Sequence, residues 1–309
     1  MSSPQLAIGV DIGGTSVKAA LVNTAPGPQL VRAGQSSPYR NPTASVLTAA
    51  VTEAVAKLQL GDDAIAAIGM CAPGIIDTAT GIVERSNNLP QLVGTSVTQI
   101  VRDALPAHTV DRPMRLVSDA LAAATGWEAS QASATCVTRT GRTLFLVMGT
   151  GVGACVLDAG VPLIVTGPGP GHIGQLDVAL AADIAAGTAP VGPVGERGSL
   201  ESYVGLPALL RRYGDDRRLL AAAGVWSISD APAAALTKAI RICTAVYRPQ
   251  HIVLLGGVGR LFAGVASQMH AEASAGLTPL AREGWTLMCG STVTDAAMGA
   301  ALLAMAGGK

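Results

Sequence analysis

Two segments of the chain share one pattern, an apolar strand followed by a glycine turn and a second apolar strand. The first covers residues 6–22 and carries DIGGTSVK at 11–18; the second covers residues 143–157 and carries GTGVG at 149–153. Apolar runs on both sides of a glycine turn predict a β-hairpin in each segment. The repetition predicts two halves of similar architecture that face one another, and a cleft between such halves is a common ligand site.

The rest of the chain alternates between strand and helix patterns. Apolar residues at helical spacing predict an amphipathic helix over about residues 43–58. Further strands are predicted at 65–70, 115–118 and 251–255, and further helices from residue 120 and at 233–247, 261–275 and 296–306. This alternation is typical of an α/β protein.

Composition excludes several classes of function. The 309 residues correspond to about two domains, and 21 basic residues balance 21 acidic ones. Balanced charge argues against a nucleic-acid partner, and no acidic block forms a tail. Only 3% of the residues are aromatic, so a sugar or base site here has to work mainly through hydrogen bonds.

The sequence also predicts a cytoplasmic protein without a membrane segment. Charged residues or prolines interrupt every long apolar stretch, and the first residues form no signal peptide. The five cysteines lie far apart and form no CxxC pair, which fits free thiols in a reducing compartment. Charged residues make up 14% of the chain, against roughly 25% on average, so we expect a homodimer or higher homo-oligomer that buries part of the surface.

The first glycine turn concentrates groups that bind phosphate. Gly13 and Gly14 let the backbone approach an anion and offer N–H groups to it. Thr15 adds a hydroxyl and Lys18 a cation, while Asp11 stands at the strand end, where it could hold a hydrated Mg²⁺ ion. An ordinary Gly-Gly hairpin with a solvated aspartate remains the alternative.

The second glycine turn, through Gly149, Thr150 and Gly151, also matches a dinucleotide-binding pattern. That fingerprint needs a helix after the glycines, whereas a strand pattern follows here, so a phosphate-binding hairpin fits better. A third turn, with Gly256 and Gly257, follows the strand at 251–255 and could receive a nucleoside. Taken alone, it is more often a plain strand-to-helix turn.

Ser118 and Asp119 stand at the end of a predicted strand, immediately before a helix. The carboxyl ends of strands face the ligand crevice in α/β sheets, so Asp119 could act as a general base. Aspartate is equally common as a helix N-cap, and the local sequence favours that interpretation.

Together these segments resemble the ROK family, which comprises repressors, open reading frames and sugar kinases. The resemblance covers essentially the whole chain. It is carried by seven segments in order, at residues 11–18, 72–81, 88–90, 118–124, 149–153, 256–258 and 295–301. It implies an α/β, two-domain actin/hexokinase-like fold with ribonuclease H-like halves and an active site in the interdomain cleft. Residues 1–118 with about 293–309 would form the small domain, and residues 119–292 the large one.

The resemblance also implies an ATP-dependent, Mg²⁺-requiring kinase with Asp119 as general base. The phosphates would contact Gly13, Gly14, Thr15, Lys18, Gly149, Thr150 and Gly151, and the adenosine Gly256 and Gly257. The acceptor would contact Asn88, Ser118, Asp119, His172, Gln175 and Glu201. The acceptor itself would be a hexose, an amino sugar or a carbocyclic pseudo-sugar, and the donor could also be polyphosphate.

Two departures from the family pattern stand out. Where the family has GExGH, this chain has GHIGQ at 171–175, so His172 replaces a hydroxyl-binding glutamate and Gln175 a histidine. A role of His172 in packing is the alternative. The three cysteines of the family's zinc segment are absent from residues 192–201, so we expect no structural zinc.

Two other functions stay open. One is a transcriptional repressor, but the first hairpin starts within a dozen residues of the beginning of this sequence and leaves no room for a DNA-binding domain before it. The other is a degenerate kinase that binds a sugar without phosphorylating it. Retention of Asp11, Lys18 and Asp119 argues against that second alternative.

Overall fold

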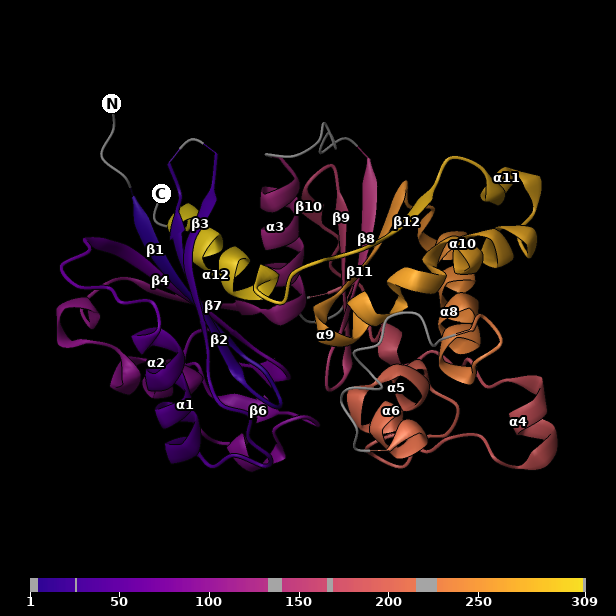
Figure 1. Cartoon of the computed structure of the whole chain (residues 1–309), viewed down its shortest axis with the longest axis horizontal. Helices are drawn as coiled ribbons and strands as arrows, with labels where there is room; N and C mark the ends of the chain where they lie inside the picture. The colour runs from indigo at the N-terminus through magenta and orange to yellow at the C-terminus, as the bar shows by residue number, and fades with distance from the viewer. Residues whose placement is uncertain (1–4, 26, 133–140, 166–168, 215–226, 308–309) are drawn as a thin grey trace. The chain divides into compact units, whose positions relative to one another are not determined.

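The computed structural model describes residues 5–25, 27–132, 141–165, 169–214 and 227–307. The chain divides into two compact units (Figure 1). Unit 1 comprises residues 1–138 and 293–309, and unit 2 comprises residues 139–292. No helix among the described residues is both long and apolar enough to cross a membrane.

The sheet of unit 1 has five strands in the order β3-β2-β1-β4-β7. Its strands are β1 (Leu6–Ile12), β2 (Val17–Asn23), β3 (Gln29–Gln35), β4 (Ile65–Ala72) and β7 (Met114–Ser118). The first three strands pair antiparallel, as hairpin connections require, while β4 and β7 join parallel to β1. The carboxyl ends of β1, β4 and β7 therefore meet at one edge of the sheet.

Unit 2 repeats this topology in the order β10-β9-β8-β11-β12. Its strands are β8 (Arg142–Met148), β9 (Val152–Asp158), β10 (Val161–Pro162), β11 (His251–Leu255) and β12 (Thr286–Cys289). Strands β8, β9 and β10 pair antiparallel, and β11 and β12 are parallel to β8. The prediction of two halves with similar architecture is confirmed.

Helices cover both faces of the unit 1 sheet. Helices α1 (Ala44–Ala56) and α2 (Val97–Ala104) lie on the face that carries Ile8 and Val10, and Thr43 caps the first turn of α1. Helices α3 (Asp119–Ala132) and α12 (Asp295–Ala306) cover the opposite face, which carries alanine and glycine. In Figure 1 α12, from the end of the chain, lies against the first strands.

Backbone meets backbone on that second face. A Cβ at Gly9 of β1 or Gly69 of β4 would lie less than 3.0 Å from a carbonyl oxygen of α12. A Cβ at Gly126 of α3 would likewise lie less than 3.0 Å from a carbonyl oxygen of α12, and a Cβ at Gly299 of α12 equally close to one of α3. Only glycine lets α12 come this close to two strands and to α3. Helix α3 is therefore packed within unit 1, beyond the domain boundary expected at residue 118.

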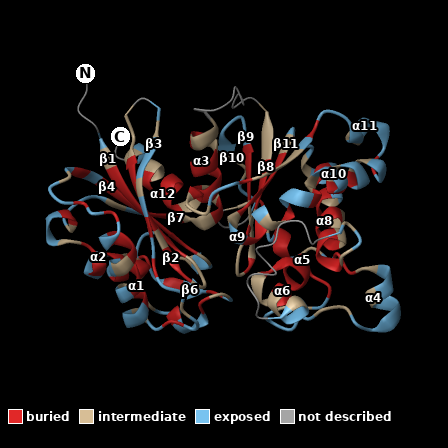
Figure 2. Ribbon diagram, viewed as in Figure 1, coloured by how far each residue is buried: buried red, intermediate tan, exposed pale blue. Residues whose placement is uncertain are grey.

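In unit 2 an apolar core joins the sheet to its helices, and Figure 2 shows buried residues along both, with exposed residues on the outer helices. Leu144 and Leu146 of β8 pack with Leu236 and Ile240 of the long helix α8 (Ala231–Tyr247). The remaining described helices are α4 (Ala181–Ala186), α5 (Leu200–Val204), α6 (Leu206–Tyr213), α9 (Gly256–Gly259), α10 (Ala266–Ala275) and α11 (Pro279–Arg282).

The predicted elements agree with the structure apart from two groups. The helix predicted at 261–275 begins as the 3₁₀ helix η4 (Arg260–Val265) and continues as α10. The elements that were not predicted are helices α2, α4, α5, α6 and α11 and strands β3, β5 (Ile75–Ile76), β6 (Val83–Arg85), β10 and β12. All of these helices have eight residues or fewer, which weakens any periodic signal.

Gly299→Ala tests the close packing of α12. The added Cβ has no room against the backbone of α3, so we expect a loss of about 3 kcal/mol in the free energy of unfolding, measured by chemical denaturation. The control is Gly169→Ala, whose Cβ would meet its nearest neighbour at an ordinary 3.5 Å. Equal stability of the two variants would contradict the packing argument.

Candidate active site

The first phosphate hairpin lies between β1 and β2 in unit 1. The Gly13 N–H donates to the Ser16 carbonyl oxygen at 3.1 Å, which closes the turn. The N–H groups of Gly14 and Thr15 have no partner in the part of the chain that the structure describes. The amide of Gly13 is therefore occupied, while those of Gly14 and Thr15 are available to an anion.

Asp11 and Lys18 face each other across this hairpin. They are directly paired in the β1–β2 register, and Lys18 Nζ lies 3.2 Å from Asp11 Oδ2. Both side chains are mostly buried, at 12% and 20% exposure. The Asp11 charge is the main reason why the pKa of Lys18 is raised, so the ammonium group keeps its proton.

Tyr39 supports the turn from outside the two strands, which the sequence did not indicate. Its hydroxyl donates to the Gly13 carbonyl oxygen at 2.5 Å, and its backbone N–H donates to the Thr15 carbonyl oxygen at 2.9 Å. Burial, followed by the Asp11 charge, raises the pKa of Tyr39, so the phenol remains a donor. Nothing in the local sequence around Tyr39 marks this contact, because it depends on the path of the chain after β3.

Asp119 lies beside this hairpin at the edge where β1, β4 and β7 end. Burial is the main cause that raises its pKa to about 6, and the negative charge of Asp11 adds to the shift. The Ala120 N–H donates to Asp119 Oδ1 at 2.8 Å and partly opposes the shift. A carboxylate with a pKa near neutrality is well suited to accept a proton from a hydroxyl group.

Ser118, and not Asp119, caps helix α3. Its Oγ accepts a hydrogen bond from the Leu121 N–H at 3.4 Å, the geometry of an N-cap side chain. The interpretation of Asp119 as the cap is therefore wrong, because the helix already begins at Asp119 and the preceding residue supplies the cap. The Asp119 carboxylate has no side-chain partner among the described residues and interacts only with the backbone N–H groups of Ala120 and Asp119.

Cys71 joins this group, although the sequence gave no reason to single it out. Its thiol is completely buried and donates to Asp11 Oδ1 at 3.7 Å. Burial and the charges of Asp11 and Asp119 raise the pKa of Cys71 well above its usual range. The only sequence signal is its place on β4, where Cys71 pairs with Asp11 in register.

Asn88 lies in a segment tied back to the end of β4. The Ser86 hydroxyl donates to the Pro73 carbonyl oxygen at 3.1 Å and accepts from the Leu89 N–H at 3.1 Å. Gly74 adopts a φ of 121° beside Ser86, a conformation that favours glycine. Asn88 is half-buried, and its side chain makes no hydrogen bond among the described residues.

The second phosphate hairpin lies between β8 and β9 in unit 2. The Gly149 N–H donates to the Gly151 carbonyl oxygen at 2.9 Å, which closes this turn as Gly13 closes the first. The N–H groups of Thr150 and Gly151 have no partner in the described ranges. Both hairpins thus use their first glycine to shape the turn and leave the next amides available.

Glu201 supports this second hairpin from helix α5. Its Oε2 accepts a hydrogen bond from the Val152 N–H at 2.8 Å, and its side chain is buried. Burial is the main cause that raises the pKa of Glu201, the Glu196 charge adds to the shift, and the bond to Val152 opposes it. One carboxylate oxygen is occupied by the hairpin, and the other has no hydrogen bond among the described residues.

His172 and Gln175 lie at the two ends of the 3₁₀ helix η3 (Ile173–Gln175), and both are exposed. Buried Ile173 and Gly174 anchor this helix between them. The exposure of His172 contradicts the packing alternative, because its ring is outside the core. The contact of His172 with an acceptor stays a prediction.

Gly256 and Gly257 differ in the space that is available for a side chain. Gly256 has a φ of 83°, and a Cβ there would lie less than 3.0 Å from the Met148 carbonyl oxygen at the end of β8. A Cβ at Gly257 would meet nothing within 4 Å. Gly256 is therefore fixed by packing, while Gly257 offers an open backbone surface at the start of α9.

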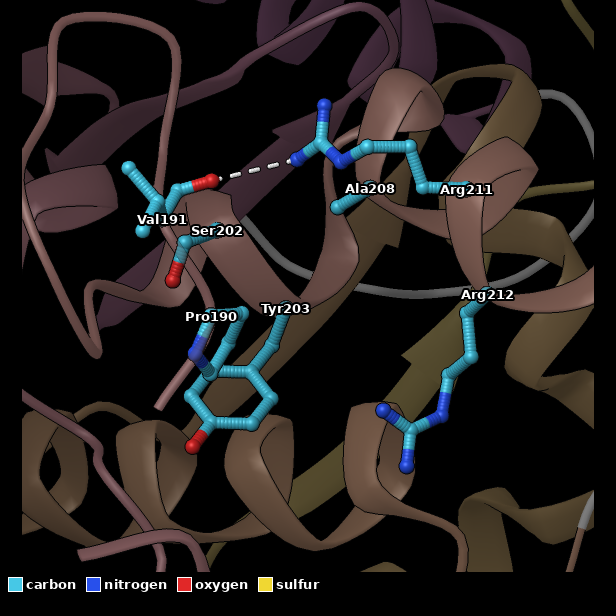
Figure 3. Close-up of a pocket in the computed structure, with 7 residues that line it drawn as sticks. All are labelled: Pro190, Val191, Ser202, Tyr203, Ala208, Arg211 and Arg212. Atoms are coloured by element: carbon cyan, nitrogen blue, oxygen red, sulfur yellow. Dashed lines mark hydrogen bonds between the residues drawn. The ribbon is translucent and has the colours of Figure 1, made fainter. Parts of the chain in front are cut away.

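A carboxylate stabilises the loop in which the family pattern has its zinc segment. Glu196 accepts hydrogen bonds from the Val194 N–H at 3.1 Å and from the Ser199 hydroxyl at 3.2 Å. Arg211 of α6 donates to the Val191 carbonyl oxygen at 3.2 Å (Figure 3). A cavity of about 280 Å³ separates this loop from α5 and α6, lined by Pro190, Val191, Ser202, Tyr203, Ala208, Arg211 and Arg212.

Glu196→Ala should weaken this loop. It removes two hydrogen bonds to a charged acceptor, so we expect the free energy of unfolding to fall by about 1–2 kcal/mol. Glu272→Ala is the control, since Glu272 is exposed on α10 and its side chain forms no hydrogen bond among the described residues. Chemical denaturation measures the free energy of unfolding of both variants. An unchanged value in Glu196→Ala would contradict the role of Glu196 in stabilising the loop.

The predicted residues thus form two groups, one in each unit. Unit 1 brings together Asp11, Lys18 and Asp119 with the turn at Gly13, and adds Cys71 and Tyr39. Unit 2 brings Glu201 to the turn at Gly149, with η3 close by through Gly174, whose Cβ would lie 3.5 Å from Glu201 Oε2.

The ROK family profile matches residues 7–306. The structure is similar to a ROK family glucokinase from Streptomyces griseus in complex with glucose and AMPPNP, with a TM-score of 0.69 and 20% identity over 98% of this chain and 100% of that one. No curated protein sequence matches the chain.

Two further structures mark the range of functions within this fold. An inorganic polyphosphate/ATP-glucomannokinase from Arthrobacter sp. strain KM has a TM-score of 0.63 and 21% identity, over 98% of this chain and 99% of that one. A ROK family transcriptional regulator, a homologue of the E. coli MLC protein, has a TM-score of 0.69 and 16% identity, over 98% of this chain and 78% of that one. The α/β fold of actin/hexokinase-like kinases is confirmed.

Proposed function

Since the chain belongs to the ROK family, we propose that it is an ATP-dependent kinase that phosphorylates a hydroxyl group of a sugar or sugar-like polyol. The observation that carries this proposal is the group formed by Asp11, Lys18 and Asp119 beside a hairpin with free amides. Similar folds include sugar kinases, among them the Streptomyces griseus glucokinase.

Backbone amides would hold the phosphates of the nucleotide. The free N–H groups of Gly14 and Thr15 and those of Thr150 and Gly151 supply donors without a basic patch, consistent with the balanced charge. Gly13 and Gly149 shape the turns, and their own N–H groups donate within the turns instead of to a phosphate. Gly256 and Gly257 would lie beside the adenosine.

The residues present fit a magnesium ion held mainly by the nucleotide. Among the described residues no group of three or more His, Cys, Asp and Glu side chains could enclose a metal. Asp11 offers a single carboxylate, and Mg²⁺ commonly binds through one or two carboxylates, water and substrate phosphates. When bound, the ion would neutralise charge that develops on the transferred phosphoryl group.

Asp119 would accept the proton of the attacking hydroxyl group. Its raised pKa improves its strength as a base, and no side chain among the described residues is hydrogen-bonded to it. The hydroxyl oxygen would then attack the terminal phosphorus in line with the departing nucleotide. Lys18, whose Nζ lies 3.2 Å from Asp11 Oδ2, would stay paired with Asp11.

Acceptor selection would fall to a polar set with few aromatic faces. We infer that Asn88, Ser118, His172, Gln175 and Glu201 contribute to it, Ser118 while also capping α3. Histidine can donate where the family's glutamate only accepts, so the preferred hydroxyl pattern should differ from that of a standard glucokinase. We further propose that the protein forms a homo-oligomer and needs no structural zinc.

Asp119→Asn should remove the general base without unfolding the protein, because Ser118 still caps α3. We expect the rate of phosphoryl transfer to fall about 10³-fold. Asp111→Asn, an exposed acid-to-amide change in the same unit, should leave the rate unchanged. A near wild-type rate in Asp119→Asn would show that another group accepts the proton.

The pH dependence of kcat/KM should reflect the raised pKa of Asp119. The carboxylate is the active form, so the rate should rise with pH through a midpoint of about 6 and level off above it. Steady-state rates measured from about pH 4.5 to about pH 8 locate this midpoint. A midpoint near the ordinary aspartate value would contradict the assigned environment.

The experiment that tests the function is an acceptor screen. Purified protein is incubated with hexoses, amino sugars or cyclitols and either ATP or polyphosphate, and ADP release and phosphorylated product are measured together. The proposal expects equal amounts of both with ATP, lost in Asp119→Asn. Calorimetric binding of an acceptor without ADP release across the panel would instead favour a binding protein.

A further inference from the structure

Cys71 lies on the same face of β4 as Gly69, two residues earlier, because side chains alternate along a strand. Gly69 is pressed against the backbone of α12, and Cys71 is the next residue on that face toward the end of β4. In register it lies between Asp11 of β1 and Val117 of β7. The Cys71 side chain is therefore sealed between the sheet and the start of α12, with no exposed surface.

The thiol has one proton and two oxygen acceptors within reach. Asp11 Oδ1 lies 3.7 Å from the sulfur and the Ala296 carbonyl oxygen 3.9 Å. The carboxylate is nearer and charged, so it is the stronger acceptor. Lys18 Nζ occupies the other Asp11 oxygen, Oδ2. The Asp11 carboxylate is thus held by a different donor on each oxygen.

Burial alone does not explain this cysteine. Cys243 is also almost completely buried, in the core of unit 2, and its thiol has no hydrogen-bond partner among the described residues. Cys243 therefore packs as a small apolar side chain. An apolar residue in place of Cys71 would fill the same space but leave Asp11 Oδ1 without its donor.

We propose that Cys71 is a positioning residue that orients the Asp11 carboxylate by donating its S–H to Oδ1. The inference depends on the proposed function, because it assumes that Asp11 holds the magnesium–nucleotide complex. Because the Cys71 side chain has no exposed surface, it would touch neither nucleotide nor acceptor. It fixes the plane of the carboxylate from the sheet side while Lys18 fixes the other oxygen, so that Asp11 is oriented before the metal binds.

The S–H stretching band in the infrared tests the contact without any catalysis. The band lost in Cys71→Ala should lie at lower frequency than the band lost in Cys243→Ala, because a hydrogen bond weakens the S–H bond. In Asp11→Asn the Cys71 band should move toward that of Cys243, since a neutral amide is a weaker acceptor. A Cys71 band at the same frequency as the Cys243 band would overturn the inference.

Magnesium activation tests the consequence. In Cys71→Ala the Mg²⁺ concentration for half-maximal activity should rise about five-fold, the typical effect of one lost hydrogen bond. Cys71→Ser, whose hydroxyl can donate in place of the thiol, should restore most of the Mg²⁺ dependence, and Cys243→Ala should not change it. An unchanged value in a folded Cys71→Ala, or no rescue by serine, would overturn the inference.

The two proposals fail in different ways. If wild-type protein phosphorylates no acceptor, the proposed function fails and the S–H band alone decides whether Cys71 holds Asp11. If wild-type protein is active, the Cys71 band has the frequency of the Cys243 band, and Cys71→Ala leaves the Mg²⁺ dependence unchanged, then only the present inference fails.

Discussion

The contact between the backbone of α12 and the sheet of unit 1 is the constraint on which the candidate site depends. Glycines at positions 9, 69, 126 and 299 let this C-terminal helix touch β1, β4 and α3 without intervening side chains. Because side chains alternate along a strand, the next residues on this face after Gly9 and Gly69 are Asp11 and Cys71. The packing that seals the sheet also encloses the carboxylate.

That enclosure sets the electrostatics of the site. Two carboxylates, Asp11 and Asp119, lie near each other where burial disfavours charge. The two carboxylates differ in their donors, since Asp11 has an ammonium group and a thiol, whereas the Asp119 carboxylate has only neighbouring backbone N–H groups. Asp11 thus has a separate side-chain donor on each oxygen, while burial raises the pKa of Asp119 to about 6, an arrangement that suits a metal-binding group beside a base.

In unit 2 two carboxylates stabilise two neighbouring loops. Glu196 gathers the turn that precedes α5, and Glu201 on α5 supports the hairpin at Gly149. The two carboxylates lie close enough for the charge of Glu196 to raise the pKa of Glu201. The position proposed to read the acceptor is thus connected, through one short helix, to the loop that stands in place of the family's zinc segment.

Sequence alone determined the elements whose physical signal is local: the two glycine hairpins, the alternation of strands with long helices, and the placement of Asp119 at a strand end. Those signals depend on neighbouring residues along the chain, so they can be recognised without knowledge of the fold. Tertiary structure decided what depends on distant residues. It brought Tyr39 to the first hairpin and Cys71 to Asp11, because these contacts join residues 26 and 60 positions apart that only packing brings together. It also decided between local alternatives that the sequence pattern left open: Ser118 caps α3, and the Gly13 and Gly149 amides close their own turns.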